Sequence, residues 1–182
     1  MTDLAAVILA GGSASRFGGD KAAFPVEGRA MLAHVHDALL PLAQRILVSV
    51  GRPEQAPEGL EIVVDAFPDR GPLAGIDAAL AAADSSWVLV VACDMPYITA
   101  DSLRLLLEAR SENLDAVIAS DSAGRLHPLC ACYHTSVRVT VRDRLERGLL
   151  SMYGLIESLP NVRKVNLPDT ALVNVNEKPD LR

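Results

Sequence analysis

Short apolar runs alternate with helical patterns along most of this chain, and that alternation restricts the fold more than any other feature. Most runs lack strict alternation of polar and apolar residues, which is typical of strands buried on both faces of a parallel sheet. Repeated strand and helix units with short connections predict a three-layer α/β sandwich with a mostly parallel sheet. The predicted strands are Leu4 to Leu9, Arg45 to Val50, Glu61 to Val64, Trp87 to Ala92, Asp115 to Ser120, His127 to Tyr133 and Arg163 to Leu167.

Helical spacing of apolar residues fills the intervals between several of the predicted strands. Pro72 suits the first turn of one helix, and Thr99 suits the N-cap of another. The apolar stripes of these helices are Met31, Leu32, Val35, Leu39 and Leu40; Leu73, Ile76, Leu80 and Ala83; and Leu103, Leu106 and Leu107.

The sequence DSAGR, from Asp121 to Arg125, separates two strand-like runs and is typical of a hairpin turn. One antiparallel element is therefore expected within the mostly parallel sheet. The loop from Gly51 to Gly59 is too short to be a domain boundary, and neither a linker nor a repeat interrupts the sequence. We therefore expect residues 1–182 to form a single domain.

Composition narrows the classes of protein and of ligand. Half of the residues are hydrophobic and 22% are charged, which excludes a disordered or low-complexity chain. The formal net charge is −6, so the basic surface that duplex nucleic acid requires is not expected. An anionic ligand would have to be bound locally, by a few cations, backbone N–H groups or a metal.

The cysteines and the N-terminal run indicate the compartment. Three cysteines, without C-x-x-C spacing and in apolar surroundings, argue against a disulfide framework or a structural zinc site. The run MTDLAAVILAGG has no cationic start and is too short for a signal peptide or a bilayer span. We therefore expect a cytoplasmic protein without a membrane partner.

A glycine-rich run, LAGGSASRFGGDK at residues 9–21, follows the first predicted strand directly. Glycines allow close backbone approach, so the N–H groups of residues 11–13 could face a polyphosphate, with Arg16 and Lys21 supplying positive charge. The run is not a Walker A motif because Ala22 follows the lysine, and it does not satisfy G-x-G-x-x-G. Either a phosphate-binding loop or a glycine-rich connection with two solvated cations fits these residues.

Asp94 follows the apolar run that ends at Ala92. Open α/β sheets bind ligands beyond the carboxyl ends of their strands, so we expect Asp94 to face the same crevice as the glycine-rich run. A carboxylate there could hold Mg²⁺, whose other ligands would be water and phosphate oxygens of a substrate. The alternative is an acidic residue that begins a turn before Pro96.

Two further segments could contact a ligand. Residues 65–75, DAFPDRGPLAG, lead from a strand end into a helix, where Gly71 and Gly75 could let a base or sugar lie against the backbone. A capped helix with a tight entry turn is the alternative. Near the C-terminus, Asn174 and Asn176 alternate on a short predicted strand, and their amides could bind a ligand or a metal-bound water, or cap a loop.

The remaining polar residues carry weaker signals. His127 precedes Pro128 in a strand near the predicted crevice, where it could touch a substrate or have a structural role. Cys130 and Cys132 share one face of that strand and are expected in the core.

Five blocks of the chain, taken in order, resemble the molybdenum cofactor guanylyltransferase (MobA) family. They are L-A-G-G-x-S-x-R-F-G-x-D-K, D-x-F-P-D-R-G-P-L-A-G, C-D-M-P-Y, H-P-L-C-A-x-Y and N-V-N-x-x-x-D-L, within a resemblance that covers Leu4 to about Leu181. The resemblance implies a Rossmann-like α/β fold. It also implies a reaction that moves GMP from GTP to the terminal phosphate of molybdopterin, with Mg²⁺ as cofactor and pyrophosphate as the second product.

The resemblance assigns roles to individual residues. Catalysis falls to Arg16, Lys21 and Asp94, with Asp94 as the metal ligand. Asn174, Asn176 and His127 fall on the pterin or substrate side. The nucleotide-binding residues are Leu9, Ala10, Gly11, Gly12, Ser13, Gly18, Lys21, Asp65, Gly71 and Gly75.

This sequence departs from the family pattern in two places. Phe17 stands where methionine is usual, a change that should affect packing more than chemistry. The segment at residues 148–152 matches only loosely, which weakens inference about the pterin end of the site.

The chemistry implied by the resemblance needs positioning and cations more than a base. A molybdopterin phosphate oxygen is already negatively charged, so the difficulty is to bring two anions together and to stabilise charge on the α-phosphoryl oxygens and the leaving pyrophosphate. The resemblance favours guanine over cytosine, because residues 9–12 read L-A-G-G where cytidylyltransferase relatives typically have L-A-A-G. The alternatives are a cytidylyltransferase, a nucleotidyltransferase for another phosphorylated metabolite, or a non-catalytic nucleotide-binding or cofactor-carrier protein. Transient contact with cofactor-insertion proteins or molybdoenzymes is also implied.

Overall fold

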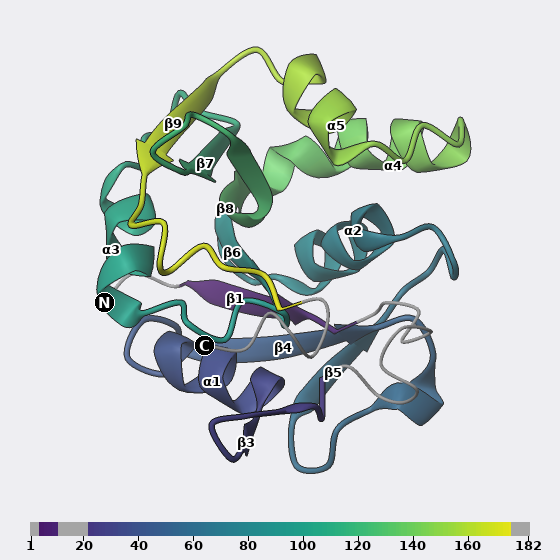
Figure 1. The fold of residues 1–182 in the computed structure, drawn as a ribbon. Helices are drawn as coiled ribbons and strands as arrows, with labels where there is room; N and C mark the ends of the chain where they lie inside the picture. The colour runs from purple at the N-terminus through teal and green to yellow at the C-terminus, as the bar shows by residue number, and fades with distance from the viewer. Residues whose placement is uncertain (1–3, 11–21, 176–182) are drawn as a thin grey trace.

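The computed structural model describes residues 4–10 and 22–175, and these residues form a seven-stranded sheet with helices on both faces (Figure 1). The strand order is β5-β4-β1-β6-β8-β7-β9, and a small two-stranded sheet pairs β2 with β3. The strands are β1 (Ala5–Leu9), β2 (Pro25–Val26), β3 (Arg29–Ala30), β4 (Arg45–Val50), β5 (Glu61–Val64), β6 (Trp87–Ala92), β7 (Ala116–Ser120), β8 (Leu126–His134) and β9 (Val162–Asn166). The helices are α1 (Met31–Leu39), α2 (Pro72–Ala82), α3 (Ala100–Glu108), α4 (Arg138–Glu146) and α5 (Met152–Ser158).

One antiparallel strand interrupts the parallel sheet, as the hairpin sequence predicts. β1 pairs in parallel with β4 and β6, β4 with β5, and β7 with β9, whereas β8 runs antiparallel to both β6 and β7. In the turn between β7 and β8, the N–H of Asp121 donates to the carbonyl of Arg125 over 3.0 Å. Gly124 adopts φ +80°, a conformation that glycine takes at little cost.

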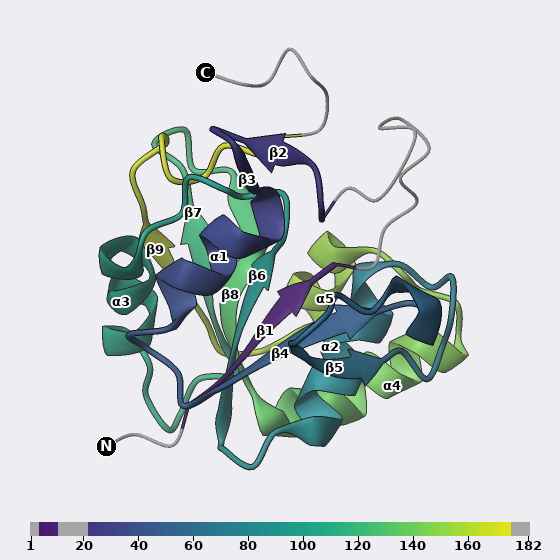
Figure 2. The ribbon, with the colours of Figure 1, turned by 90° about the horizontal axis from the view of Figure 1, so that it is seen from below.

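Two apolar clusters, one on each face of the sheet, produce the predicted three layers. Buried side chains of α1 and α3 pack on one face, and those of α2, α4 and α5 pack on the other. Figure 2 shows the two groups of helices separated by the sheet. Cys130 and Cys132 are fully buried in the first cluster, which confirms their expected place in the core.

The predicted starts of two helices are confirmed. Pro72 occupies the first turn of α2, where its missing N–H leaves no backbone bond unmade. The side-chain oxygen of Thr99 accepts the N–H of Ser102 over 3.2 Å and caps α3.

Three expectations about local structure are wrong in detail. α1 ends at Leu39, so Leu40 lies outside the apolar stripe and is 56% exposed. Likewise α2 ends before Ala83, whose backbone is extended. The segment at residues 173–175 forms no strand and lies against the turn after β6 instead.

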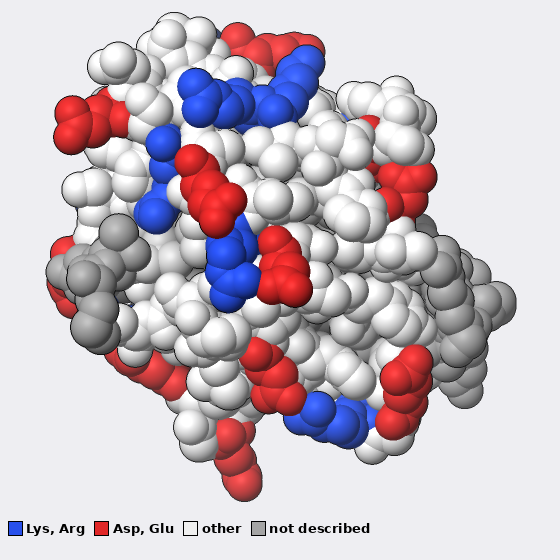
Figure 3. Space-filling model, turned by 90° about the vertical axis from the view of Figure 1, so that its left-hand side faces the viewer, with Lys and Arg blue, Asp and Glu red and all other residues white. Residues whose placement is uncertain are grey.

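Charged side chains of both signs are interspersed on the face of the molecule that Figure 3 shows. On α3, for example, Arg104 donates to Asp101 over 2.6 Å. In the part of the chain that the structure describes, no helix is long and apolar enough to span a lipid bilayer.

Candidate functional site

Four parallel strands end together at one edge of the sheet, and the candidate site begins there. The N–H of Ala10 donates to the carbonyl of Ser49, and the N–H of Cys93 donates to the carbonyl of Leu9, over 3.0 and 3.1 Å. The ends of β1, β4 and β6 are thereby joined. The side chain of Leu9 is buried in the apolar cluster that includes α2. Leu9 and Ala10 thus lie at the expected edge, and their nucleotide-binding role stays a prediction.

Asp94 lies at the end of β6 in contact with the C-terminal segment. Its carbonyl accepts the N–H of Val175 over 2.8 Å, and the side-chain amide of Asn174 approaches its Oδ1 at 3.5 Å. Val175 is fully buried beside Val26 and Met31, which fixes this segment. The structure therefore brings together two predicted site residues that are 80 positions apart in the sequence.

The surroundings of Asp94 fit a magnesium ion held mainly by substrate. Among residues 4–10 and 22–175, no three His, Cys, Asp or Glu side chains gather into a metal-binding cluster. Mg²⁺ in phosphate-transfer sites is usually bound through one or two carboxylates, with substrate phosphates and waters as its other ligands. Asp94, half-buried at the strand ends, supplies a hard oxygen donor of that kind.

Asp65, at the end of β5, is held by β4. The hydroxyl of Ser49 donates to its Oδ1 over 2.8 Å. Burial raises the pKa of Asp65 above its ordinary value, and the bond from Ser49 opposes that shift only in part. The ionised carboxylate is therefore less stable here than it would be in water.

Gly75 has a packing role that accounts for the missing side chain. A Cβ atom at this position would lie 2.5 Å from Oγ of Ser49 and 2.9 Å from Cδ2 of Leu9. Glycine thus lets α2 approach β1 and β4 closely, and keeps the Ser49 hydroxyl free to hold Asp65. Direct contact of Gly75 with a nucleotide stays a prediction.

Gly71 differs from Gly75 although both belong to one sequence block. It is exposed, precedes α2 and adopts φ +65°, and a Cβ atom there would meet nothing within 4 Å. The glycine is required by the backbone conformation, and the space beside it is open. A ligand could lie against the backbone at Gly71, and its nucleotide-binding role stays a prediction.

The loop between β5 and α2 is supported by α4. The Arg142 guanidinium lies 5.3 Å from the centre of the Phe67 ring, and its Nε lies 3.5 Å from Oδ1 of Asp77. Arg138 approaches the same carboxylate oxygen at 3.2 Å. Asp77 is almost fully buried on α2, so the two arginines compensate its charge and tie α4 to α2, while Arg142 also contacts the loop at Phe67.

A cavity of about 680 Å³ adjoins Asn174 at the same edge of the sheet, and we call it the edge cavity. Because β8 is antiparallel, its first residues lie beside the carboxyl ends of β6 and β7. The volume is in the range of small-molecule sites. The lining residues are Met95, Asp121, Arg125, Leu126, His127, Pro128, Leu129, Met152, Tyr153, Asp169, Leu172, Val173 and Asn174.

His127 and Asn174, both predicted on the pterin or substrate side, line this one cavity. The His127 side chain is 11% exposed, and its Nε2 lies 3.6 Å from Oδ2 of Asp121, too far for a hydrogen bond. Among the residues that the structure describes, Nε2 has no hydrogen-bond partner. Burial lowers the pKa of His127, and the neighbouring Asp121 opposes that shift only in part.

Two carboxylates organise the hairpin beside His127. Oδ1 of Asp121 accepts the backbone N–H groups of Ala123 and Arg125, and Oδ2 accepts Nε of Arg125 over 2.9 Å. Burial alone would raise the pKa of Asp121, but the bonds from Arg125 outweigh it and lower the pKa. Asp169 accepts both the N–H and the hydroxyl of Ser122, and these bonds lower its pKa.

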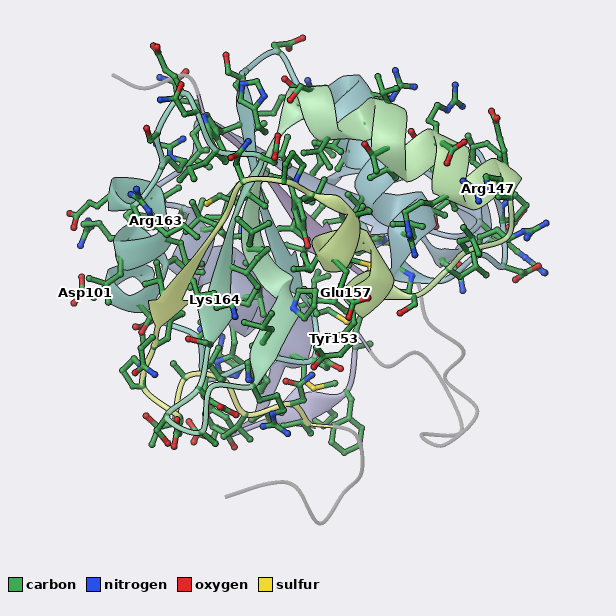
Figure 4. All side chains as sticks on the ribbon, turned by 90° about the horizontal axis from the view of Figure 1, so that it is seen from above. Asp101, Arg147, Tyr153, Glu157, Arg163 and Lys164 are labelled. Atoms are coloured by element: carbon green, nitrogen blue, oxygen red, sulfur yellow. The ribbon has the colours of Figure 1, made fainter. Side chains whose placement is uncertain are left out.

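Sequence reasoning did not single out Arg125, Tyr153 or Asp169 as site residues. Their segments are distant in sequence and meet only at the edge cavity, so no local pattern identifies them. Figure 4 shows Tyr153 extending from α5. The predicted site residues Gly11, Gly12, Ser13, Arg16, Gly18, Lys21 and Asn176 lie outside the described residues, and their roles stay predictions.

Comparison with known proteins identifies the relatives of this chain. Residues 6–162 match the family model of the MobA-like NTP transferase domain. The chain is 34% identical over 163 residues to the probable molybdenum cofactor guanylyltransferase of Carboxydothermus hydrogenoformans, spanning 90% of this chain and 80% of that protein. It is also 34% identical over 180 residues to the molybdenum cofactor guanylyltransferase of Vibrio parahaemolyticus, spanning 96% and 91% of the two chains.

A solved structure has the same fold. The molybdopterin-guanine dinucleotide biosynthesis protein A of Archaeoglobus fulgidus matches with a TM-score of 0.82 at 23% identity, over 97% of this chain and 94% of that chain. At this identity the likeness concerns the fold alone, and it confirms the expected Rossmann-like α/β class.

Proposed function

Because the chain belongs to the family of MobA-like NTP transferases, we propose that it transfers GMP from GTP to the terminal phosphate of molybdopterin, releasing pyrophosphate. Nucleotidyl transfer of the MobA type is what the family and the names of its relatives support. The identity of both substrates, the need for Mg²⁺ and a cytoplasmic location belong to the proposal. The burial of the Cys93, Cys130 and Cys132 thiols in the core agrees with a reducing compartment.

The observation that carries the proposal is the position of Asp94 and Asn174 between two differently built regions. On one side lie the ends of β1, β4 and β5, with Asp65 and Gly71; on the other lies the edge cavity. A reaction that joins a nucleotide to a second phosphorylated substrate needs two neighbouring sites with the reacting phosphates between them.

In the proposed reaction, an oxygen of the molybdopterin phosphate attacks the α-phosphorus of GTP. The new P–O bond forms as the bond from the α-phosphorus to the bridging oxygen of the β-phosphate breaks, and pyrophosphate leaves with that electron pair. The attacking oxygen is already ionised, so no residue has to remove a proton. Positioning and charge stabilisation therefore supply the catalysis.

The residues take the following parts in this proposal. Arg16 and Lys21 bind the phosphate oxygens, and backbone N–H groups of residues 11–13 support them. Asp94 would hold Mg²⁺, which when bound would offset negative charge on the phosphates. His127 and Asn174 contact the pterin substrate in the edge cavity, and Asp65 and Gly71 lie on the nucleotide side.

The proposal can be tested by supplying molybdopterin and Mg²⁺ with each of the four NTPs in turn, labelled at the α-phosphate. We expect label to enter a dinucleotide from GTP, with an equal amount of pyrophosphate released. Transfer from CTP instead would identify a cytidylyltransferase. Tight GTP binding without pyrophosphate release would identify a nucleotide-binding or carrier protein, and transfer only to another phosphorylated acceptor would replace molybdopterin.

A further inference from the structure

Two tyrosine hydroxyls bind alternate carbonyl groups at the start of β8. The buried hydroxyl of Tyr133 donates to the carbonyl of Pro128 over 2.8 Å. The hydroxyl of Tyr153, from α5, donates to the carbonyl of Leu126 over 2.9 Å. His127 lies between these two carbonyls in the sequence, and all three residues Leu126, His127 and Pro128 line the edge cavity.

The sheet holds this part of β8 at Leu126 and His127, which pair with β7, but not at the next two residues. Its pairing with β7 jumps from Ala131 opposite Ile118 to His127 opposite Ala119, and its pairing with β6 begins only at Cys130. Pro128 and Leu129 therefore have no paired residue in either neighbouring strand. Pro128 also lacks an N–H group, so a regular ladder cannot continue through it.

The buried Pro128 carbonyl needs a donor from another source, because an unpaired buried carbonyl is costly. Tyr133 is fully buried in the cluster on the α2 side and supplies that donor. Burial raises the pKa of the Tyr133 hydroxyl, which therefore keeps its proton and remains a donor. Tyr153, whose side chain is half-exposed, donates to the carbonyl of Leu126, two residues before Pro128.

We propose that Tyr133 and Tyr153 are positioning residues, whose hydroxyls fix the wall of the edge cavity that carries His127. The proposal rests on the proposed function only in naming molybdopterin as the ligand of that cavity. The fixing of His127 is a claim about the free protein and can be tested without any substrate.

The substrate-free test is an NMR titration of the histidine rings in Tyr133→Phe and Tyr153→Phe. The chain has only four histidines, so the His127 signals can be assigned. Phenylalanine keeps the ring volume and removes the hydroxyl alone. We expect the pKa of His127 to rise toward its ordinary value in Tyr133→Phe, because a loosened wall admits water to the buried ring.

The charged groups that face His127 are Asp121 at 3.6 Å, Arg125 and Asp169, and neither substitution replaces any of them. We expect a smaller shift of the same sign in Tyr153→Phe. His127 titration curves that match the original protein in both tyrosine variants would overturn the proposal.

Kinetics then separate positioning from general stability. In Tyr133→Phe we expect the KM for molybdopterin to rise about tenfold, as expected for loss of about 1.4 kcal/mol of binding, with the KM for GTP nearly unchanged. Two control variants test whether any loss of packing or of a hydrogen bond has the same effect. Cys132→Ala removes buried volume from the same strand. Ser158→Ala removes a hydroxyl-to-carbonyl hydrogen bond of 2.6 Å within α5. Neither should change the KM for molybdopterin.

The outcomes distinguish this inference from the proposed function. An equal rise of both KM values in Tyr133→Phe and Cys132→Ala would reduce Tyr133 to a structural residue and overturn the inference. If the original protein transfers nothing to molybdopterin, the proposed function fails, and the histidine titration alone decides whether the two tyrosines fix His127.

Discussion

The two halves of the sheet's carboxyl edge are built in different ways. In the half formed by β5, β4, β1 and β6, parallel strands end together and α2 packs directly beneath them through Gly75. In the half formed by β8 and β7, an irregular antiparallel strand borders the edge cavity, and carboxylates and tyrosine hydroxyls hold its backbone. The first half is governed by close packing and the second by polar bonds.

This difference predicts how each half responds to change. Interiors at native packing density have little room for an added methyl group, so the parallel half should be sensitive to volume. The cavity half has free space and partly buried ionisable groups, so it should be sensitive to charge and pH. Asp94 lies between the halves and should affect the reaction itself.

The largest effect is expected from Asp94→Ala. Loss of this carboxylate should lower the rate of the proposed GMP transfer at least about a hundredfold, because the proposal places its charge at the reacting phosphates. The midpoint of thermal unfolding should change little. Asp101→Ala, an exposed acidic residue on α3, is the control and should leave the rate unchanged. A low melting temperature with normal activity per folded molecule would show that Asp94 only shapes the turn.

Gly75→Ala tests close packing in the parallel half. The added methyl group has to displace Ser49 or Leu9, which we expect to cost about 1 to 3 kcal/mol of unfolding free energy in a denaturant titration. Ser49→Ala removes one of the two obstructing groups, so the double variant should lose less stability than the sum of the single variants. Additive losses would mean that Gly75 and Ser49 do not share this contact.

Asp65→Asn tests the charge on the nucleotide side. The raised pKa means that the folded state binds this proton more tightly than the unfolded chain, so ionised Asp65 lowers stability above its ordinary pKa. We therefore expect the melting temperature to rise by about 1 to 3 °C near neutral pH, with the gain vanishing below about pH 4. GTP-dependent activity should fall about tenfold. A variant that is less stable at neutral pH would contradict this interpretation.

His127→Gln tests how the stability of the cavity half depends on pH, and we expect its effect to be the smallest of the four. A lowered pKa means that the unfolded chain takes up a proton before folded His127 does. The contribution of His127 to stability is thus present above about pH 6.5 and is lost as the pH falls. As the pH is lowered from about 7.5 to 5.5, the free energy of unfolding measured by denaturant titration should fall less in the variant than in the original protein. The two decreases should differ by less than about 1 kcal/mol. Parallel pH profiles would contradict the shift.

Much of the fold could be predicted because its signals are local. Glu61–Val64 and Trp87–Ala92 have the predicted bounds, and Pro72 and Thr99 start their helices, since each depends on a few neighbouring residues. The prediction that the apolar stripe of α1 includes Leu40 is wrong, because apolar spacing alone does not show where a helix ends. The Asp121 turn identified the antiparallel strand, but not the irregular pairing at Pro128.

In the candidate site too, local motifs identify some residues, whereas only the tertiary structure identifies others. Asp65 and Asp94 lie at strand ends as their motifs predict, because parallel topology places such ends together, and their roles stay predictions. Only the structure shows why glycine is needed at Gly71 and at Gly75. A glycine required for close packing and a glycine required for a positive φ look identical in sequence. The roles of Tyr153 and Asp169 also could not be predicted from the sequence. Tyr153 contacts β8 and Asp169 contacts the hairpin only in the tertiary structure.

The central claim, that the two halves of one edge hold two different substrates, is tested most directly by hydrogen exchange on the unaltered protein with one ligand at a time. A GTP analogue that cannot be cleaved between its α- and β-phosphates should slow exchange in residues 65–75. Molybdopterin, under anaerobic conditions, should slow exchange in residues 121–129 and in Met152 and Tyr153. Protection of the same residues by both ligands, or no protection of the edge cavity by molybdopterin, would contradict the account.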